Sequence, residues 1–163
     1  NIARSVLEKL SGFNPKEVLI FDPFLSQEQI TSKTINDINT KKVELGELLT
    51  QANIISLHLP LLPATKHLIA KDQFNLMKKD AIIINTSRGG IIEEDDLCNF
   101  LDKNQLAFAA LDVFENEPNI NPKLKEKKNC ILTPHISSMT KIAQDRMIME
   151  AKENFEKYIN MNK

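Results

Sequence analysis

Residues 81–95 read AIIINTSRGGIIEED, and this stretch decides the fold. Its first four residues are apolar and mostly β-branched with no polar residue between them, which predicts a strand buried on both faces. Polar residues end the strand, and Arg88 follows, then two glycines at which the backbone can turn sharply. The acidic residues after them fit a helix start, which favours negative charge. An arginine therefore stands at the carboxyl end of a core strand, where open α/β sheets bind ligands.

The composition narrows the class of protein. The 163 residues suffice for one domain with its own core, and the net charge is −1. No basic block and no long apolar run is present, so we predict neither a nucleic-acid partner nor a membrane span. No cleavable leader is recognisable either, and Cys98 and Cys130 both lie in apolar segments. We expect buried, reduced thiols in a cytoplasmic protein without a metal site.

The hydrophobic pattern alternates between strands and helices along the chain. Short apolar runs predict strands at 18–21, 54–59, 81–84, 107–114 and 129–133. Helical spacing predicts helices at 2–10, 45–49, 70–77, 93–102 and 140–160. The polar segment 26–42 is expected to be a loop that leads to a short strand near Val43. This alternation is typical of an α/β fold with a doubly wound parallel sheet.

Each expected strand ends in a polar or charged residue, namely Asp22, His58, Arg88, Asp112 or His135. In a parallel sheet these ends meet at one edge and line a crevice. Asp22 fits a plain turn, but a carboxylate after the second strand of a dinucleotide fold binds ribose hydroxyls and repels a 2′-phosphate. Such an acid lies about 20 residues after the phosphate-binding glycines, and counting back from Asp22 reaches Asn1 and Ile2.

Three side chains are candidates for catalysis. Arg88 is either an ion-pair partner of the acidic helix start or a bidentate clamp for a carboxylate. His135 is either a structural residue or a proton carrier, a role that imidazole fills near neutral pH. Glu117 follows a strand and would orient the His135 ring if the two side chains meet. His58 and His67 are expected to be structural.

Taken together, these residues resemble the D-isomer-specific 2-hydroxyacid dehydrogenase family over nearly the whole chain. The segments that carry the resemblance are FDP at 21–23, SLHLPLLPAT at 56–65, NTSRGG at 85–90, LDVFENEP at 111–118 and TPHI at 133–136. The resemblance implies a Rossmann-type NAD-binding domain at 1–140 whose first strand and glycine-rich loop are missing. It also implies that the helix at 141–163 leads back to an absent substrate domain.

The resemblance implies roles for individual residues as well. Arg88 would hold the carboxylate and keto oxygen of the substrate, and His135 would transfer the proton with Glu117 as its partner. NAD would be the cofactor, with Asp22 on the adenine ribose and Asp112 on the nicotinamide carboxamide. The other expected cofactor contacts, besides Arg88 and His135, are Asn1, Ile2, Leu59, Thr86, Ser87, Ile136, Ser137 and Ser138.

The function that the resemblance implies is NAD-dependent interconversion of a D-2-hydroxy acid and its 2-keto acid, which this piece would not perform by itself. Oxidation of D-3-phosphoglycerate for serine biosynthesis is the first candidate reaction. Reduction of glyoxylate or hydroxypyruvate and D-lactate dehydrogenation are alternatives. An NAD(H)-sensing corepressor without turnover and a non-catalytic remnant are competing hypotheses. The expected partners are a small 2-hydroxy or 2-keto acid and a second copy of the chain, in a homodimer formed through the cofactor domain.

Overall fold

The computed structural model of the chain describes residues 2–31 and 38–161, so Asn1 lies outside it. The strands within these ranges are β1 (Val18–Ile20), β2 (Thr40–Lys42), β3 (Ile54–Leu57), β4 (Ile82–Asn85), β5 (Phe108–Leu111) and β6 (Cys130–Leu132). The α-helices are α1 (Ile2–Leu10), α2 (Gln27–Thr31), α3 (Leu45–Gln51), α4 (Lys71–Leu76), α5 (Glu94–Lys103), α6 (Pro122–Lys125) and α7 (Lys141–Met161). Two short 3₁₀ turns are η1 (Ser11–Phe13) and η2 (Gly89–Ile91).

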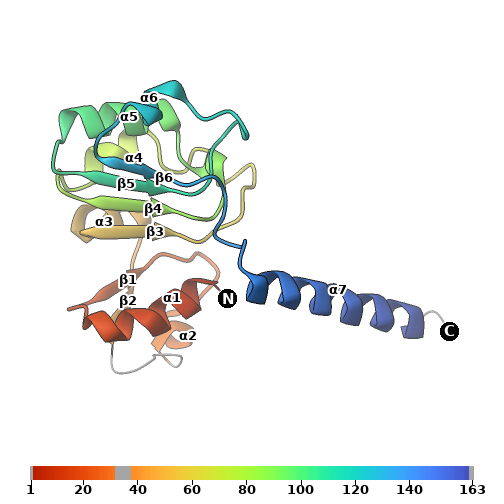
Figure 1. Cartoon of the computed structure of the whole chain (residues 1–163). Helices are drawn as coiled ribbons and strands as arrows, with labels where there is room; N and C mark the ends of the chain where they lie inside the picture. Colours follow the sequence, from red (N-terminus) through yellow and green to blue (C-terminus); the bar gives the residue numbers. More distant parts are fainter. Residues whose placement is uncertain (1, 32–37, 162–163) are drawn as a thin grey trace.

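The strands form two parallel sheets. The larger has the order β3-β4-β5-β6, and its register places Ile83 of β4 opposite Ile55 of β3 and Ala109 of β5. The smaller pairs β1 with β2, and Figure 1 shows it on the β3 side of the larger sheet. Strands alternate with helices throughout, so the predicted α/β class with parallel strands is confirmed.

In the described part of the chain, only one face of the larger sheet is well buried. Ile55, Ile83 and Ala109 pack into one apolar core with residues of α3, α4, α5 and α6. On the opposite face, Ile54 is 62% exposed and Ile131 is 55% exposed. The prediction that the strand at 81–84 is covered on both faces is therefore wrong, because the helices that supply the core all pack against the same side.

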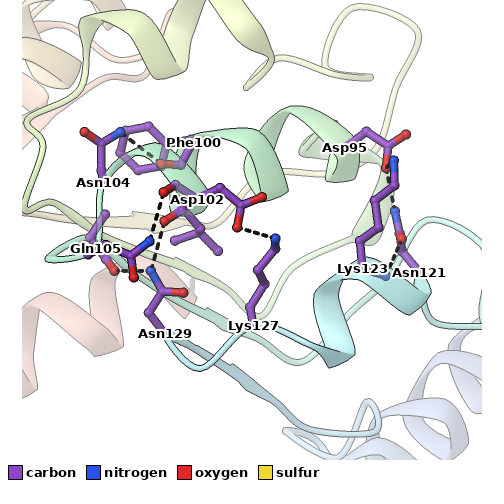
Figure 2. Close-up of polar contacts among 11 residues, drawn as sticks. Asp95, Phe100, Asp102, Asn104, Gln105, Asn121, Lys123, Lys127 and Asn129 are labelled. Atoms are coloured by element: carbon purple, nitrogen blue, oxygen red, sulfur yellow. Dashed lines mark hydrogen bonds and ion pairs between the residues drawn. The ribbon is translucent and has the colours of Figure 1, made fainter.

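Ring stacking joins two helices of the core, and polar contacts attach the segment between α6 and β6 to it. The Phe74 and Phe100 rings stack with their centroids 5.2 Å apart, which holds α4 against α5. Lys127 Nζ donates to Asp102 Oδ1 of α5 at 2.5 Å, a contact that is drawn in Figure 2. Asn129, just before β6, donates from Nδ2 to the Ala107 carbonyl at 3.0 Å. These contacts fix the chain that leads into β6, whose far end carries part of the site.

Two short helices and several boundaries differ from the predictions. The segment 26–42 contains α2, with Ile30 buried, although it was expected to be a loop; residues 32–37 of it lie outside the described ranges. The strand expected near Val43 is β2, which ends one residue earlier. Helix α6 starts at Pro122, where Asn121 accepts a hydrogen bond from the Lys123 N–H. Helices of four or five residues are too short to reveal a hydrophobic period.

Helix α7 extends away from the sheets, as Figure 1 shows. It spans 21 residues and none of them is buried. Large apolar side chains, including Ile142, Ile148 and Phe155, are exposed along it. No described helix combines the length and the apolar character needed to cross a membrane.

Candidate functional site

The turn after β4 is built by a buried amide. Asn85 is 1% exposed, and its Oδ1 accepts hydrogen bonds from the Ser87 N–H at 3.0 Å and the Ser87 hydroxyl at 2.8 Å. Its Nδ2 donates to the Arg88 carbonyl at 2.8 Å. These bonds pair the Ser87 N–H and the Arg88 carbonyl, so Asn85 fixes the backbone of the turn on which Arg88 lies.

The Arg88 guanidinium is exposed, and its Nη1 donates to the Ser87 carbonyl at 2.6 Å. Among the described residues, no carboxylate lies within ion-pair distance of it. The acids at the start of α5 have other partners: Glu93 caps the helix at the Asp96 N–H, and Glu94 accepts from the Glu115 N–H. The structural ion pair considered for Arg88 is not formed, which favours the carboxylate clamp.

Gly89 brings this turn against the loop that follows β5. A Cβ atom added at Gly89 would lie 2.0 Å from the carbonyl carbon and oxygen of Phe114 and 2.6 Å from the Glu115 nitrogen. Neither Gly89 nor Gly90 has a positive φ, so a sharp turn is not the reason for glycine here. The reason at Gly89 is close approach of two backbones.

Glu117 and His135 meet, as predicted. His135 Nδ1 lies 2.8 Å from Glu117 Oε2, and Glu117 Oε1 accepts a hydrogen bond from the Phe114 N–H at 2.9 Å. The contact with His135, followed by the bond from Phe114, holds the pKa of Glu117 below its ordinary value. The carboxylate is therefore charged near neutral pH, and it orients the imidazole while leaving Nε2 unengaged by this pair.

Asp112 anchors the residues around His135. It is 4% exposed, and its carboxylate accepts from the Thr133 hydroxyl at 2.6 Å, the Ile136 N–H at 2.9 Å and the Ser137 N–H at 2.8 Å. Burial raises the pKa of Asp112, but these hydrogen bonds outweigh burial and lower it to about 2. His135 between them has φ 53°, a conformation that non-glycine residues rarely adopt. The Asp112 carboxylate stabilises that conformation by binding the chain on both sides of it.

A cavity of about 250 Å³ lies at the carboxyl ends of β3 and β4. Four residues predicted to contact the cofactor line it together with Arg88, namely Ile2, Leu59, Thr86 and Ser87. His58 and Pro60 complete the lining. His58 Nε2 lies 2.9 Å from the Ser56 hydroxyl, and burial lowers the pKa of His58. The sequence placed His58 at the strand ends that were expected to line a crevice but assigned it a structural role, and the structure places it in the cavity wall.

The remaining predicted contacts lie outside this lining. Asp22 follows β1, is partly exposed, and accepts a hydrogen bond from the Phe24 N–H at 2.9 Å. Ile136, Ser137 and Ser138 are exposed and follow His135. The described residues thus form two groups: the cavity lining with Arg88, and the Asp112–Glu117–His135 group at the ends of β5 and β6, which does not line the cavity. Gly89 joins the two through its contact with Phe114.

Sequence reasoning missed two residues that shape this site, Asn85 and Glu94. Asn85 is a polar residue at the end of an apolar strand, a signal that was visible but that fits any turn. Glu94 stands three, four and seven residues before Leu97, Cys98 and Leu101, which places it on the buried face of α5. An acid at an inward position of an amphipathic helix is a recognisable signal, but its neighbours Glu93 and Asp95 concealed it.

Comparison with known proteins identifies the domain. Residues 1–137 match the family model of the NAD-binding domain of D-isomer specific 2-hydroxyacid dehydrogenases. A D-3-phosphoglycerate dehydrogenase of Methanocaldococcus jannaschii is 37% identical over 143 residues, which cover 88% of this chain and 26% of that protein. A glyoxylate reductase of Aeropyrum pernix is 47% identical over 111 residues, covering 68% of this chain and 33% of that protein.

Solved structures agree with this assignment. A glyoxylate reductase from Paecilomyes thermophila aligns with a TM-score of 0.81 and 31% identity, over 91% of this chain and 43% of that one. A D-lactate dehydrogenase with NAD⁺ from Lactobacillus jensenii aligns with a TM-score of 0.77 and 30% identity, over 91% and 46%. The chain thus spans less than half the length of each of these proteins. It belongs to the D-isomer specific 2-hydroxyacid dehydrogenase family, and the part that it represents is the NAD-binding domain.

Proposed function

We propose that the protein to which this chain belongs is an NAD-dependent dehydrogenase that interconverts a D-2-hydroxy acid and its 2-keto acid. The observation that carries the proposal is the 2.8 Å contact between His135 Nδ1 and Glu117 Oε2 on the loops after β5 and β6. The turn with Arg88 packs through Gly89 against the loop after β5, which carries Glu117. An oriented imidazole, and an arginine that has no carboxylate partner among the described residues, are the two groups that keto acid reduction requires.

The lining of the cavity is compatible with NAD. It combines the hydroxyl groups of Thr86 and Ser87 with the apolar side chains of Ile2 and Leu59, a mixture typical of cofactor sites. When bound, the nicotinamide of NAD supplies or accepts the hydride. We assign Asp22 to the adenine ribose, where its charge disfavours a 2′-phosphate and so favours NAD over NADP. Contacts from Asn1, Ile136, Ser137, Ser138 and the Asp112 carboxylate remain predictions.

Each catalytic candidate has a chemical task. Arg88 binds the substrate carboxylate and stabilises the negative charge that develops on the keto oxygen. His135 donates the proton to that oxygen from Nε2 during reduction and takes it back during oxidation. The Glu117 carboxylate accepts a hydrogen bond from the Nδ1–H of His135, which fixes the ring and stabilises its charged form.

For the substrate, we place D-3-phosphoglycerate first, within serine biosynthesis. Relatives from Methanocaldococcus jannaschii and Synechocystis carry the name D-3-phosphoglycerate dehydrogenase, at 37% and 40% identity. Glyoxylate and hydroxypyruvate reduction come next, because other relatives carry those names.

We also propose a cytoplasmic homodimer. Burial raises the pKa of Cys98 to about 11 and of Cys130 to about 12, so both thiols stay protonated near neutral pH, although Cys130, which was expected to be buried, is only partly so.

We further propose that residues 1–140 form an NAD-binding domain whose sheet is completed by one more strand between β1 and β3. The two sheets are both parallel, and within the described ranges β1 and β3 each have a neighbouring strand on one side only. The cavity beside β3 includes Ile2, which places the start of α1 at this edge. Residues 141–163 then lead to a substrate domain, which would cover the apolar side chains of α7.

A steady-state assay of the full-length protein tests the function. We expect oxidation of NADH with glyoxylate, hydroxypyruvate or pyruvate, and reduction of NAD with D-3-phosphoglycerate. His135→Gln and Arg88→Gln are expected to lower kcat/KM by about a hundredfold or more. Lys79→Gln, in the exposed turn before β4, likewise removes a positive charge; it is the matched control and should behave as the wild type.

Two results would contradict this proposal. Tight NADH binding without turnover of any of these substrates would favour the NAD(H)-sensing protein instead. A wild-type kcat/KM in Arg88→Gln would show that the guanidinium does not hold the substrate.

A further inference from the structure

We propose that Glu94 and His67 are positioning residues for the Glu117–His135 pair, because they clamp the loop at 114–117 from two different elements. Neither residue lines the cavity that contains Arg88. The inference rests on the proposed function, in which Glu117 orients His135. It concerns how that orientation is maintained.

The inner half of the clamp is Glu94. Its Oε1 accepts a hydrogen bond from the Glu115 N–H at 2.8 Å, and the residue is 7% exposed in the first turn of α5. Placing a carboxylate on the buried face of a helix is costly unless a donor meets it. The Glu115 N–H is the donor found here, so α5 holds the loop backbone directly.

The outer half of the clamp is His67, on the segment between β3 and α4. His67 Nε2 lies 2.9 Å from Glu115 Oε1. The His67 N–H donates to the Gly90 carbonyl at 2.8 Å, so this imidazole is attached to the same turn that carries Arg88. Lys66 Nζ lies 3.9 Å from the same carboxylate oxygen and is well exposed, which makes it a weak third partner.

The clamp acts on Glu117 through a short stretch of backbone. Glu115 is two residues from Glu117, and the Phe114 N–H bonds Glu117 Oε1 at 2.9 Å. Without these two contacts, neither the backbone N–H nor the carboxylate of Glu115 is held by α5 or by His67, although Phe114 stays in the core and Gly89 still packs against the loop. Displacement of an orienting group by about 1 Å can cost up to a hundredfold in rate, so loss of the clamp is expected to act on turnover.

Four variants separate positioning from general stability. Glu94→Ala removes the acceptor for the Glu115 N–H, whereas Glu94→Gln keeps an oxygen and is the rescue. His67→Asn shortens the side chain beyond reach of Glu115, yet asparagine tolerates the left-handed φ of 50° found at this position. Asp95→Asn is the matched control, because it neutralises an exposed acid in the same turn of α5. Asp95 contacts Asn121 and Lys123 at the start of α6 and does not contact Glu115.

The first measurement is steady-state kinetics of the full-length protein with NADH and whichever of glyoxylate, hydroxypyruvate or pyruvate the wild type reduces fastest. Glu94→Ala and His67→Asn are expected to lower kcat by about tenfold and to change KM by less than about twofold. Their pH profiles of kcat for reduction should shift in the same direction as that of Glu117→Gln. That direction is toward lower pH, because an imidazole that loses its charged partner gives up its proton at a lower pH. Glu94→Gln and Asp95→Asn should stay within about twofold of the wild type in kcat.

The second measurement needs no turnover. Titration of ¹³C-labelled glutamate carboxyl groups, with Glu117→Gln to assign the signal, reports the pKa of Glu117. This pKa is held low by the contact with His135, so it should rise toward its ordinary value in Glu94→Ala and His67→Asn and stay unchanged in Glu94→Gln and Asp95→Asn.

Unchanged pH profiles and an unchanged Glu117 pKa in the two clamp variants would overturn the proposal. Should Glu94→Ala fail to fold, His67→Asn decides. Absence of turnover in the wild type would refute the proposed function, but the titration would still test the clamp.

Discussion

Asp112 is the residue on which the backbone around His135 depends. In Asp112→Asn, an NH₂ group replaces one carboxylate oxygen. This group cannot accept a hydrogen bond, so at least one of the donors on Thr133, Ile136 and Ser137 loses its acceptor. We expect a loss of about 1–3 kcal/mol in the free energy of unfolding at pH 7, measured by urea denaturation of the full-length protein. The exposed Asp102, which pairs with Lys127 in Figure 2, gives the matched control Asp102→Asn, with an expected loss under about 1 kcal/mol.

The same carboxylate predicts a pH dependence. The pKa of Asp112 is about 2, below the ordinary 3.8, so its stabilising effect is complete above about pH 4 and is lost as the pH falls toward 2. The stability difference between wild type and Asp112→Asn should therefore narrow by about 1 kcal/mol between pH 7 and pH 3. Urea midpoints at the two pH values measure it, and an equal difference at both would contradict the assigned hydrogen bonds.

At the level of residues, the sequence indicates which side chains are candidates for catalysis better than it indicates which groups each side chain contacts. The contact of Glu117 with His135 is present, but it was implied by the family resemblance, whereas the residues alone left it open. The partners of Asp112 lie 21 to 25 residues further along the chain, and nothing local in the sequence indicates them. Glu94 escaped prediction for a related reason, since its donor is a backbone N–H, which every residue except proline provides.

At the level of elements, the site depends on two backbones that touch where η2 meets the loop after β5. Gly89→Ala would place its methyl group 2.0 Å from Phe114 backbone atoms, and one of the two segments must move. We expect destabilisation of about 1–3 kcal/mol and loss of the proposed dehydrogenase activity, since the Arg88 turn and the Glu117 loop separate. Gly90→Ala is the matched control, because its methyl group would meet only the Leu61 side chain at 3.4 Å.

Thermal unfolding and kinetics of the two full-length glycine variants provide the measurement. If Gly89→Ala and Gly90→Ala behave alike, close packing of η2 on the loop does not control the site.

The elements themselves were predictable where hydrophobic periodicity extends over enough residues. Helices α5 and α7 and strand β4 fall within a few residues of their expected positions. Helices α2 and α6 could not be predicted, because caps and tertiary contacts stabilise them, as at Asn121. The expected burial of Ile82 and Ile84 was wrong for a different reason: an apolar strand reveals its own hydrophobicity, but it does not reveal which helices are present to cover each face.

At the level of the whole molecule, the proposed strand between β1 and β3 has a consequence that hydrogen exchange can detect. If the strand is present in the full-length protein, β3 is an interior strand with hydrogen-bonded neighbours on both sides. Amides of Ile54–Leu57 should then exchange as slowly as those of Phe108–Leu111 in β5, which has β4 and β6 as neighbours. An edge strand would instead leave alternate amides without partners, and these exchange faster by orders of magnitude. Rapid exchange across β3 alongside slow exchange across β5 would show that the sheet ends at β3, and the proposed organisation of residues 1–140 would be wrong.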